Sequence, residues 1–240
     1  MRVACKFNNT TYKMTYQEKI RQLYGLDETK NYGFSETEIL ELEKKEGLTI
    51  PKILREYYLT IGKNEEINFS FNRLLKPKNQ AGFSNDKHFV FYEENQSVVF
   101  WGIKEQDLQL ENPCVYGNYD AVNLTQEWFV DSLTTENFLL SMAFWNGVLG
   151  GLKFNANTEA ENDLTEIVIN QVEENWTEIK GITNQQLRFF TNDFTDIIVF
   201  TTDLNSKING LFIGSNDKKK YKNIINILKI EWDYRTDRDE

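Results

Sequence analysis

The stretch Phe89-Val-Phe-Tyr-Glu-Glu-Asn-Gln-Ser-Val-Val-Phe-Trp-Gly102 decides the fold of this chain. It consists of two runs of β-branched and aromatic residues on either side of a polar segment, Glu93-Glu94-Asn95-Gln96. Such runs favour extended strands, and a short polar segment between them favours a turn. The sequence therefore predicts a β-hairpin at the centre of the fold.

A capping box marks the best-defined helix before this hairpin. Ser35 is followed by Glu38 three residues later, and Gly47 stands where a left-handed C-terminal cap belongs. The apolar stripe between them is short, so we expect a peripheral helix. The residues expected to hold it on the body are Phe34, Ile39, Leu40 and Leu42.

Three further helices are predicted nearby. Residues 15–25 form a short helical pattern that ends in glycine. Residues 50–61 place apolar side chains at three- and four-residue spacing, with Pro51 in the first turn and a glycine at the end. After the hairpin, a helix begins near Thr134 and ends near Gly147.

The remaining apolar runs are short and separated by turn residues. Asn112-Pro-Cys-Val-Tyr-Gly117 indicates a turn followed by a strand. In the last third we expect strands at Leu187–Phe190, Asp196–Thr201, Gly210–Ile213 and Ile230–Tyr234, with helices at Leu164–Trp176 and Tyr221–Leu228. Short links between such strands favour an antiparallel sheet, so the pattern predicts an α+β fold.

The composition points to a globular chain of the cytoplasm. No apolar run approaches the length of about 20 residues that a membrane helix needs, and the N-terminus lacks the apolar stretch of a signal peptide. The two cysteines, Cys5 and Cys114, form neither a disulfide framework nor a zinc spacing. We therefore expect a reduced, cytoplasmic protein without a membrane partner.

Negative charge is concentrated in one part of the chain. The net charge is +3 for residues 1–80, −13 for residues 81–180 and zero for residues 181–240, which gives −10 in total. An acidic block of this kind repels nucleic acid and attracts basic partners, although it can also be a solvated face that aids solubility. Charge by itself leaves both interpretations open.

The patterns of common catalytic and cofactor sites are missing. His88 is the single histidine, and no nucleophile elbow, phosphate-binding loop or dinucleotide-binding glycine pattern accompanies it. The basic run Lys218–Lys222 is typical of a solvated helix end. Paired glutamates such as Glu93 and Glu94 leave a carboxylate-dependent hydrolase open as an alternative. We predict no catalytic residue, no metal ligand and no cofactor.

Three segments, in this order, resemble the SUKH superfamily, which includes yeast cell-wall assembly regulators and bacterial immunity proteins. Ile50-Pro-Lys-Ile-Leu-Arg-Glu-Tyr-Tyr58 resembles the helix after that family's Leu-Pro signature, and residues 89–102 resemble its central strands. Asn112-Pro-Cys-Val-Tyr116, Trp128 and Leu133–Trp145 resemble its Asp-Pro-Pro-Val-Tyr motif, tryptophan and closing helix. The resemblance covers about residues 35–152. Ile50 and Cys114 depart from the pattern.

This resemblance implies a central antiparallel sheet flanked by helices, without enzymatic activity. It divides the chain into a SUKH-like domain with its N-terminal helices (residues 1–152) and a C-terminal α/β extension of strands and helices packed on the same body (residues 153–240). It also implies a bacterial immunity protein that neutralises a cognate toxin by direct contact, and such toxins are often basic nucleases. A regulatory scaffold or adaptor is the alternative from the same family.

The acidic block supplies the candidate contacts with such a toxin. They are the acidic residues in or near the predicted strand layer, namely Glu93, Glu94, Asp107, Glu111, Asp120 and Glu127. We expect them to meet a cationic surface of the toxin as a nucleic-acid mimic would. The protein is expected to be a monomer when free and to bind no nucleic acid directly.

Overall fold

The computed structural model describes residues 14–119, 128–159 and 165–237. Within these ranges the chain forms seven α-helices, a short 3-10 helix and a π-helical turn. The helices are α1 (Tyr16–Tyr24), α2 (Glu36–Glu46), α3 (Lys52–Thr60), α4 (Glu65–Asn68), η1 (Glu105–Asp107), α5 (Thr135–Asn146), η2 (Gly147–Gly151), α6 (Glu166–Asn175) and α7 (Lys218–Leu228).

The strands form two separate antiparallel sheets. The first contains β1 (Arg73–Leu74), β2 (Gly82–Phe83), β3 (His88–Glu93), β4 (Phe100–Lys104), β5 (Val115–Asn118) and β6 (Phe129–Ser132), in the order β1-β3-β4-β5-β6 with β2 also paired to β3. The second contains β7 (Phe154–Glu159), β8 (Thr177–Glu178), β9 (Leu187–Thr191), β10 (Asp196–Thr202), β11 (Ile208–Ser215) and β12 (Tyr234–Arg235), in the order β12-β7-β11-β10-β9-β8.

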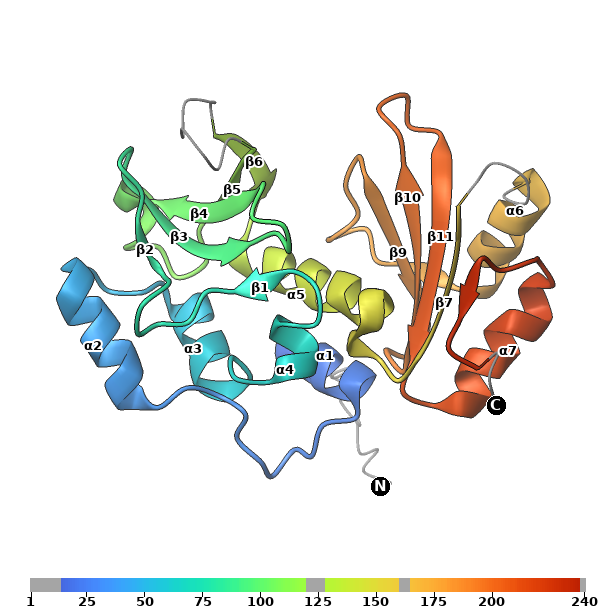
Figure 1. Ribbon diagram of the computed structural model, residues 1–240, viewed down its shortest axis with the longest axis horizontal. Helices are drawn as coiled ribbons and strands as arrows, with labels where there is room; N and C mark the ends of the chain where they lie inside the picture. The colour runs from blue at the N-terminus through green and yellow to red at the C-terminus, as the bar shows by residue number, and fades with distance from the viewer. Residues whose placement is uncertain (1–13, 120–127, 160–164, 238–240) are drawn as a thin grey trace, which may run out of the picture.

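These pairings confirm the α+β class with antiparallel sheets. The second sheet corrects one detail, because its six strands pair antiparallel throughout and the C-terminal part is therefore α+β rather than alternating α/β. In Figure 1 the first sheet and the helices α1–α4 lie on the left, and the second sheet lies on the right. No helix in the described parts of the chain is long and apolar enough to cross a membrane.

The predicted hairpin is confirmed as the pair β3 and β4. Phe89 pairs with Ile103, and Glu93 pairs with Phe100. A bulge between Val90 and Tyr92 shifts the register, so that Phe91 and its neighbour Tyr92 are both buried and both touch the ring of Phe138 from α5. The bulge thus places two consecutive aromatic side chains in the same core, which strict alternation would forbid.

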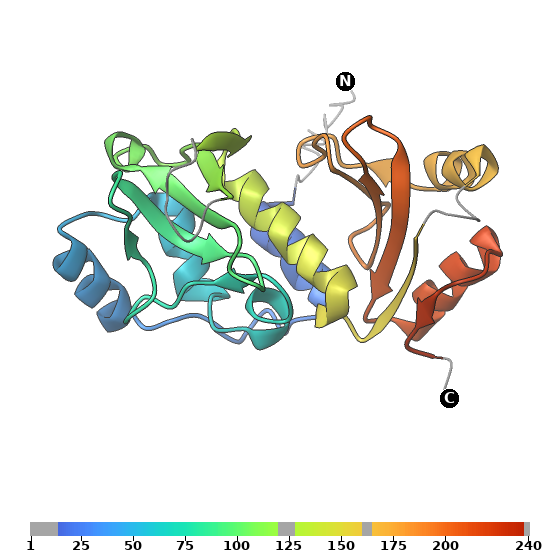
Figure 2. The same ribbon diagram turned by 45° about the horizontal axis from the view of Figure 1, so that its top comes forward.

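Helix α5 lies between the two sheets and joins them. Toward the first sheet, the ring centroid of Phe138 lies 5.7 Å from that of Trp101 in β4. Toward the second sheet, the ring centroids of Phe144 and Phe189 in β9 are 6.4 Å apart, and those of Trp145 and Phe212 in β11 are 5.1 Å apart. Figure 2 shows α5 running diagonally between the sheets. This position explains why α5 is apolar on nearly all sides: it is covered from two directions.

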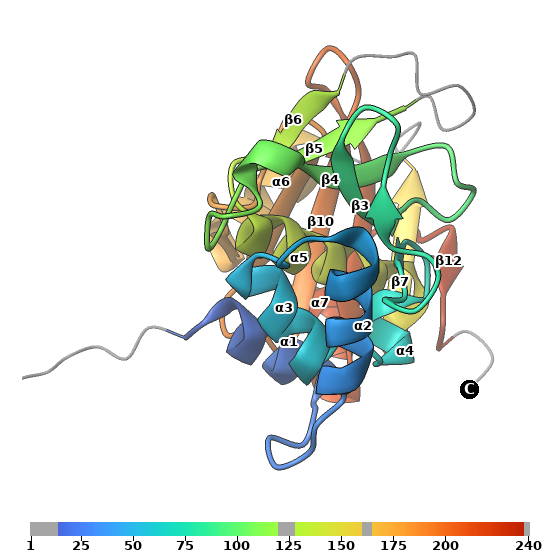
Figure 3. The same cartoon turned by 90° about the vertical axis from the view of Figure 1, so that its left-hand side faces the viewer.

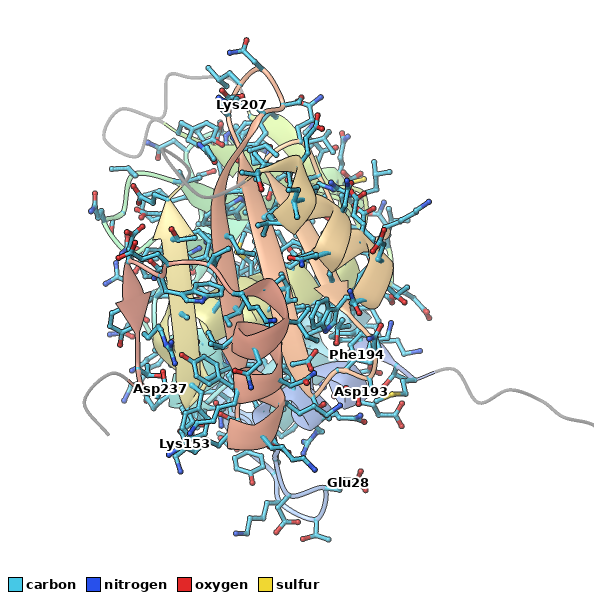
Figure 4. The ribbon with its side chains drawn as sticks, turned by 90° about the vertical axis from the view of Figure 1, so that its right-hand side faces the viewer. Glu28, Lys153, Asp193, Phe194, Lys207 and Asp237 are labelled. Carbon is cyan, nitrogen blue, oxygen red and sulfur yellow. The ribbon has the colours of Figure 1, made fainter. Side chains whose placement is uncertain are left out.

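The second sheet is also covered on both faces. In β10, Ile197 and Val199 belong to the core that includes α5, while Ile198 and Phe200 belong to a second core beneath α6 and α7. Figure 4 shows α6 and α7 on this outer face, with Lys207 at the tip of the β10–β11 hairpin and Asp193 toward the opposite end of the sheet. Burial on two faces accounts for the nearly continuous apolar run of β10.

The capping box of α2 is confirmed, and Gly47 adopts the predicted left-handed conformation with φ of 68°. Figure 3 shows α2 and α3 together below the strands of the first sheet. The expected contribution of Leu40 is wrong: its side chain is 52% exposed, because only Ile39 and Leu42 point toward the body. Helix α3 begins at Lys52, so Pro51 precedes the first turn instead of lying in it.

The predicted closing strand Ile230–Tyr234 is largely wrong. Only Tyr234 and Arg235 pair with β7, and the segment before them has no regular structure. Its apolar residues have another role, since Trp232 is 2% exposed and packs in the core under α6 and α7. Burial of a single side chain from an irregular segment leaves the same apolar pattern in the sequence as a short strand.

Candidate binding groove

A groove of about 650 Å³ lies where the first sheet, helix α5 and the segment 180–187 meet. Its floor is one face of α5, since Asn137, Ser141 and Trp145 recur every four residues and line it together. The helix starts here because the Thr134 hydroxyl accepts the backbone N–H of Asn137 at 3.3 Å. A cavity of this size lies in the range of ordinary ligand and anchor-residue sites, about 300–1,000 Å³.

The first sheet supplies one wall through Trp101, Tyr119 and Asp131. Gly117 shapes this wall, because a β-carbon there would lie 2.4 Å from the ring of Phe129. The ring of Phe129 therefore occupies the space that a side chain at position 117 would need, and Tyr119 stacks on this ring with the ring centroids 4.9 Å apart and nearly parallel planes. The result is an aromatic wall that ends at the carboxyl group of Asp131.

The opposite wall is the loop between β8 and β9. The Asn184 side-chain oxygen accepts the backbone N–H groups of Gln186 and Leu187, each at 2.8 Å, which fixes the turn. Ile182 anchors the loop in the core at 6% exposure. Lys180 lies on this wall and is the one cation among the described residues that line the groove.

The surroundings of Asp131 in the groove raise the pKa of its carboxyl group. Burial raises the pKa of its carboxyl to about 6, and the neighbouring indole N–H of Trp101 offsets only part of the rise. That N–H makes no hydrogen bond of ordinary geometry, although Trp101 is only 8% exposed. The Asp131 carboxyl group and the Trp101 indole N–H thus share a partly closed space without forming a hydrogen bond of ordinary geometry with each other.

A second buried polar atom without a partner borders the groove. Asn72 is 3% exposed and its side-chain oxygen accepts no hydrogen bond, whereas its amide nitrogen contacts the sulfur of Met142 at 3.7 Å. Buried polar atoms of this kind are uncommon and costly, so an unpaired acceptor and an unpaired donor on one groove call for an explanation.

The structure separates the acidic residues named from the sequence into two groups. Glu93 and Glu94 lie at the turn of the β3–β4 hairpin, and Glu94 lines the groove. Asp107 and Glu111 follow β4 at the other end of the hairpin. The length of β4 alone separates the two ends by roughly 13 Å. Asp120 and Glu127 lie outside the described residues.

Local contacts distinguish these residues further. Glu93 is paired with Arg73 at 2.9 Å, and its side chain is 14% exposed. Glu111 is exposed and lies 3.6 Å from the ammonium group of Lys52. Glu94 makes no such ion pair with any residue that the structure describes; its carboxylate accepts the backbone N–H of Gln96 at 2.8 Å and lines the groove. Of the described candidates, Glu94 is the one that the groove brings together with Asp131.

Sequence reasoning missed Asp131. The signal that could have revealed it is its place two residues after Phe129 in the strand Phe129–Ser132, because period-two alternation predicts that the two side chains share a face. In the structure a register shift falls at Asp131, between the pairs Val115–Ser132 and Tyr116–Val130. An acidic residue on the face that carries the neighbouring aromatic ring is unusual enough to mark a site. The sequence could not show that α5 and the β8–β9 loop would enclose it.

The single histidine lies on the opposite face of the first sheet from these aromatic groups. His88 stacks on Trp128 at 4.0 Å, and its Nδ1 is 3.5 Å from a carboxylate oxygen of Asp86. Burial lowers the pKa of His88, against the opposing effect of Asp86. Trp128 donates its indole N–H to Asp86, so the three side chains hold one another in place.

Within residues 14–119, 128–159 and 165–237, no three His, Cys, Asp or Glu side chains converge as metal ligands would. Comparison with known proteins gives no further guide: no protein-family model, no curated protein and no solved structure matches the chain. The groove must therefore be interpreted from its own chemistry.

Proposed function

We propose that this chain is a non-catalytic binding protein that neutralises a basic bacterial toxin domain by direct contact. The observation that carries the proposal is the groove, where the carboxyl groups of Glu94 and Asp131 border an aromatic wall. Carboxylates beside aromatic side chains are suited to a protein partner that presents cations on an apolar surface.

Exposed apolar groups at the same place favour a macromolecular partner. Leu133 is 76% exposed and Tyr119 is 49% exposed, and both line the groove. Large apolar side chains gathered at a groove are typical of interfaces, in which tyrosine and tryptophan contribute much of the binding energy. A small polar metabolite would leave these side chains in water.

The charge distribution supports a basic partner. The block of residues 81–180 carries the whole negative excess, and several of its carboxylates are already neutralised locally. Arg73 pairs with Glu93 and Lys87 pairs with Glu105, each at 2.9 Å. Asp131 and Glu94 make no ion pair with the residues in the described ranges, so they are available to steer a cationic surface toward the groove.

The resemblance to the SUKH superfamily supplies the biological context of the proposal. Helix α3 after Pro51, the β3–β4 hairpin, strand β5 after Pro113 and helix α5 follow one another in the order of that family's motifs. We accordingly propose a SUKH-like fold for about residues 35–152. As an immunity protein it would act in the cytoplasm of the cell that it protects.

Co-expression tests this function directly. The toxic C-terminal domain of a secreted protein encoded immediately upstream is produced in a bacterial host with and without this chain. We expect growth to be restored and the two proteins to purify together. Asp131→Asn and Leu133→Asp should weaken the complex at least tenfold, whereas Glu41→Gln, an exposed position on α2 away from the groove, should leave it unchanged.

Two outcomes would contradict the proposal. A metabolic gene in the upstream position, with no toxin domain, would remove its biological basis. A complex that forms equally well with Asp131→Asn, Leu133→Asp and the control would move the interface away from the groove, which is the observation on which the proposal depends.

A carboxylate-dependent hydrolase is the second candidate, since two carboxyl groups line one groove and one has a pKa near 6. A carboxyl group with a raised pKa beside a second carboxyl group is the arrangement that a general acid of such an enzyme requires. Hydrolysis of a panel of oligosaccharides that Asp131→Asn abolishes would favour this candidate. A third alternative, a scaffold or adaptor, would bind a regulatory protein in the same groove without relieving toxicity.

A further inference from the structure

We propose that the groove is a socket for an arginine side chain, with the Asp131 carboxylate as its ion-pair partner and Trp101 as part of its wall. The source of the arginine, a basic toxin, rests on the function proposed above. The socket itself rests on three groups that line the groove, namely Asp131, Trp101 and Asn72.

Polar groups of the groove lack hydrogen-bond partners among the described residues. The Asn72 side-chain oxygen is an acceptor without a donor, and Asp131 has only the imperfectly placed Trp101 N–H beside it. Both Asn72 and Trp101 are more than nine-tenths buried. A ligand that brings several N–H donors into this space should therefore bind more tightly, because it supplies donors to buried acceptors that otherwise lack them.

A guanidinium group fits the chemistry of this groove. Arginine carries five N–H donors in one plane and no acceptor, so it can pair with a carboxylate and still donate to an amide oxygen. It also stacks on aromatic rings, and the groove offers Trp101, Trp145 and Tyr119. Lysine has a smaller, strongly hydrated ammonium group and would use this planar, aromatic setting less well.

The charge differs across the groove. Lys180 lies on the opposite wall, near enough to Glu178 for its positive charge to lower the pKa of that carboxyl group. The pKa of Glu178 is lowered mainly by the hydrogen bond from Arg188, with Lys180 as the smallest contribution. Asp131 and Glu94, by contrast, lie with the first sheet, so the cationic end of an arginine is expected on that side.

The test uses short peptides and the full chain, without any toxin. Gly-Arg-Gly is titrated into the protein and compared with the citrulline peptide, which has the same shape without the charge. Nuclear magnetic resonance follows the Asp131 carboxyl carbon and the Trp101 indole N–H. We expect both signals to shift with the arginine peptide and the pKa of Asp131 to fall by at least one unit, because a nearby cation favours the carboxylate.

Three variants complete the test. Asp131→Asn should weaken binding of the arginine peptide at least tenfold, and Glu41→Gln, on the exposed side of α2, should bind it as the unchanged protein does. Trp101→Phe keeps an aromatic ring but removes the N–H, and should retain most of the binding while raising the pKa of Asp131. Binding retained by Trp101→Phe would show that a substitution in the groove does not by itself disrupt the groove.

Equal shifts with the arginine and citrulline peptides, or no shift of the Asp131 signal at saturating arginine peptide, would overturn the socket. The result is separate from the toxin test. Peptide binding without growth rescue would retain the socket and reject the immunity function. Growth rescue without any response of Asp131 to the peptide would retain the immunity function and reject the socket.

Discussion

Asn146 and Asn72 exchange two hydrogen bonds through the side chain of one and the backbone of the other. The Asn146 amide nitrogen donates to the Asn72 carbonyl at 2.9 Å, and its side-chain oxygen accepts the Asn72 backbone N–H at 2.9 Å. The same amide nitrogen also donates to the Ile67 carbonyl at 2.8 Å. An asparagine at the end of α5 thus pairs with the chain just before β1 as a neighbouring strand would.

Replacing Asn146 should therefore be among the most damaging single changes in the first half of the chain. Asn146→Ala leaves the Asn72 N–H and two carbonyls buried without partners, and we expect the free energy of unfolding to fall by about 3 kcal/mol or more. Urea denaturation measures the loss. Asn175→Ala, an exposed asparagine bonded to the Gln171 carbonyl, is the control, and a similar loss there would refute the explanation.

Two carboxyl groups that are shielded from water predict an unusual dependence of stability on pH. Burial raises the pKa of both Asp131 and Asp196 to about 6, and for Asp196 the nearby charge of Asp193 adds to the rise. The folded protein then holds these protons more tightly than the unfolded chain. Their contribution to stability therefore increases as pH falls from about 7 toward 4.

Asp196→Asn separates this effect from other titrations. Removing the buried charge should raise the free energy of unfolding by about 2 kcal/mol at neutral pH, and the gain should vanish near pH 4, where the native carboxyl is protonated. Urea denaturation across this pH range gives the difference. A gain that is the same at every pH would show that charge burial is not its cause.

Glycine at position 151 allows the chain between α5 and β7 to pack closely on α4. A β-carbon there would lie 2.3 Å from the Glu66 carbonyl oxygen, a backbone atom that cannot move aside easily. Gly151→Ala should therefore cost about 1–3 kcal/mol. Gly181→Ala, where the nearest atom is 3.9 Å away, should change stability by less than about 0.5 kcal/mol. Thermal denaturation of the two variants compares them directly.

Neutralising Glu94 should affect association with a toxin more than neutralising Glu93. Glu94→Gln keeps an oxygen for the Gln96 N–H but removes a charge from the groove, so we expect the association rate constant to fall roughly threefold at low salt. Glu93→Gln mainly weakens the ion pair with Arg73. Stopped-flow mixing at low and high salt measures both, and equal effects would contradict this ranking.

Local features of the fold were predictable because their causes are local. The Ser35–Glu38 capping box and the terminal glycine lie within one helix, and both were found as predicted. The β3–β4 hairpin follows from two apolar runs and the turn between them. By contrast, β1 and β2 contain two residues each, and they exist as strands only because β3 lies beside them.

The groove could not be predicted from the sequence, because tertiary contacts bring together segments that are distant along the chain. Asp131 and Trp101 are distant from the 180–187 segment along the chain, and α5 brings them to one place by packing on both sheets. The same packing distinguishes the acidic residues, since Arg73 neutralises Glu93 while Glu94 borders the groove. Sequence reasoning treated these two neighbours as equivalent.

The sequence by itself determined the α+β class, most of the longer helices and strands, and the acidic excess of residues 81–180. These properties follow from composition and short-range periodicity. Only the tertiary structure decided which carboxyl groups are paired, exposed or enclosed, because a pKa and an ion pair depend on groups from other elements. The hairpin that decides the fold contributes Trp101 and Glu94 to the groove, but Asp131 acquires its character from burial.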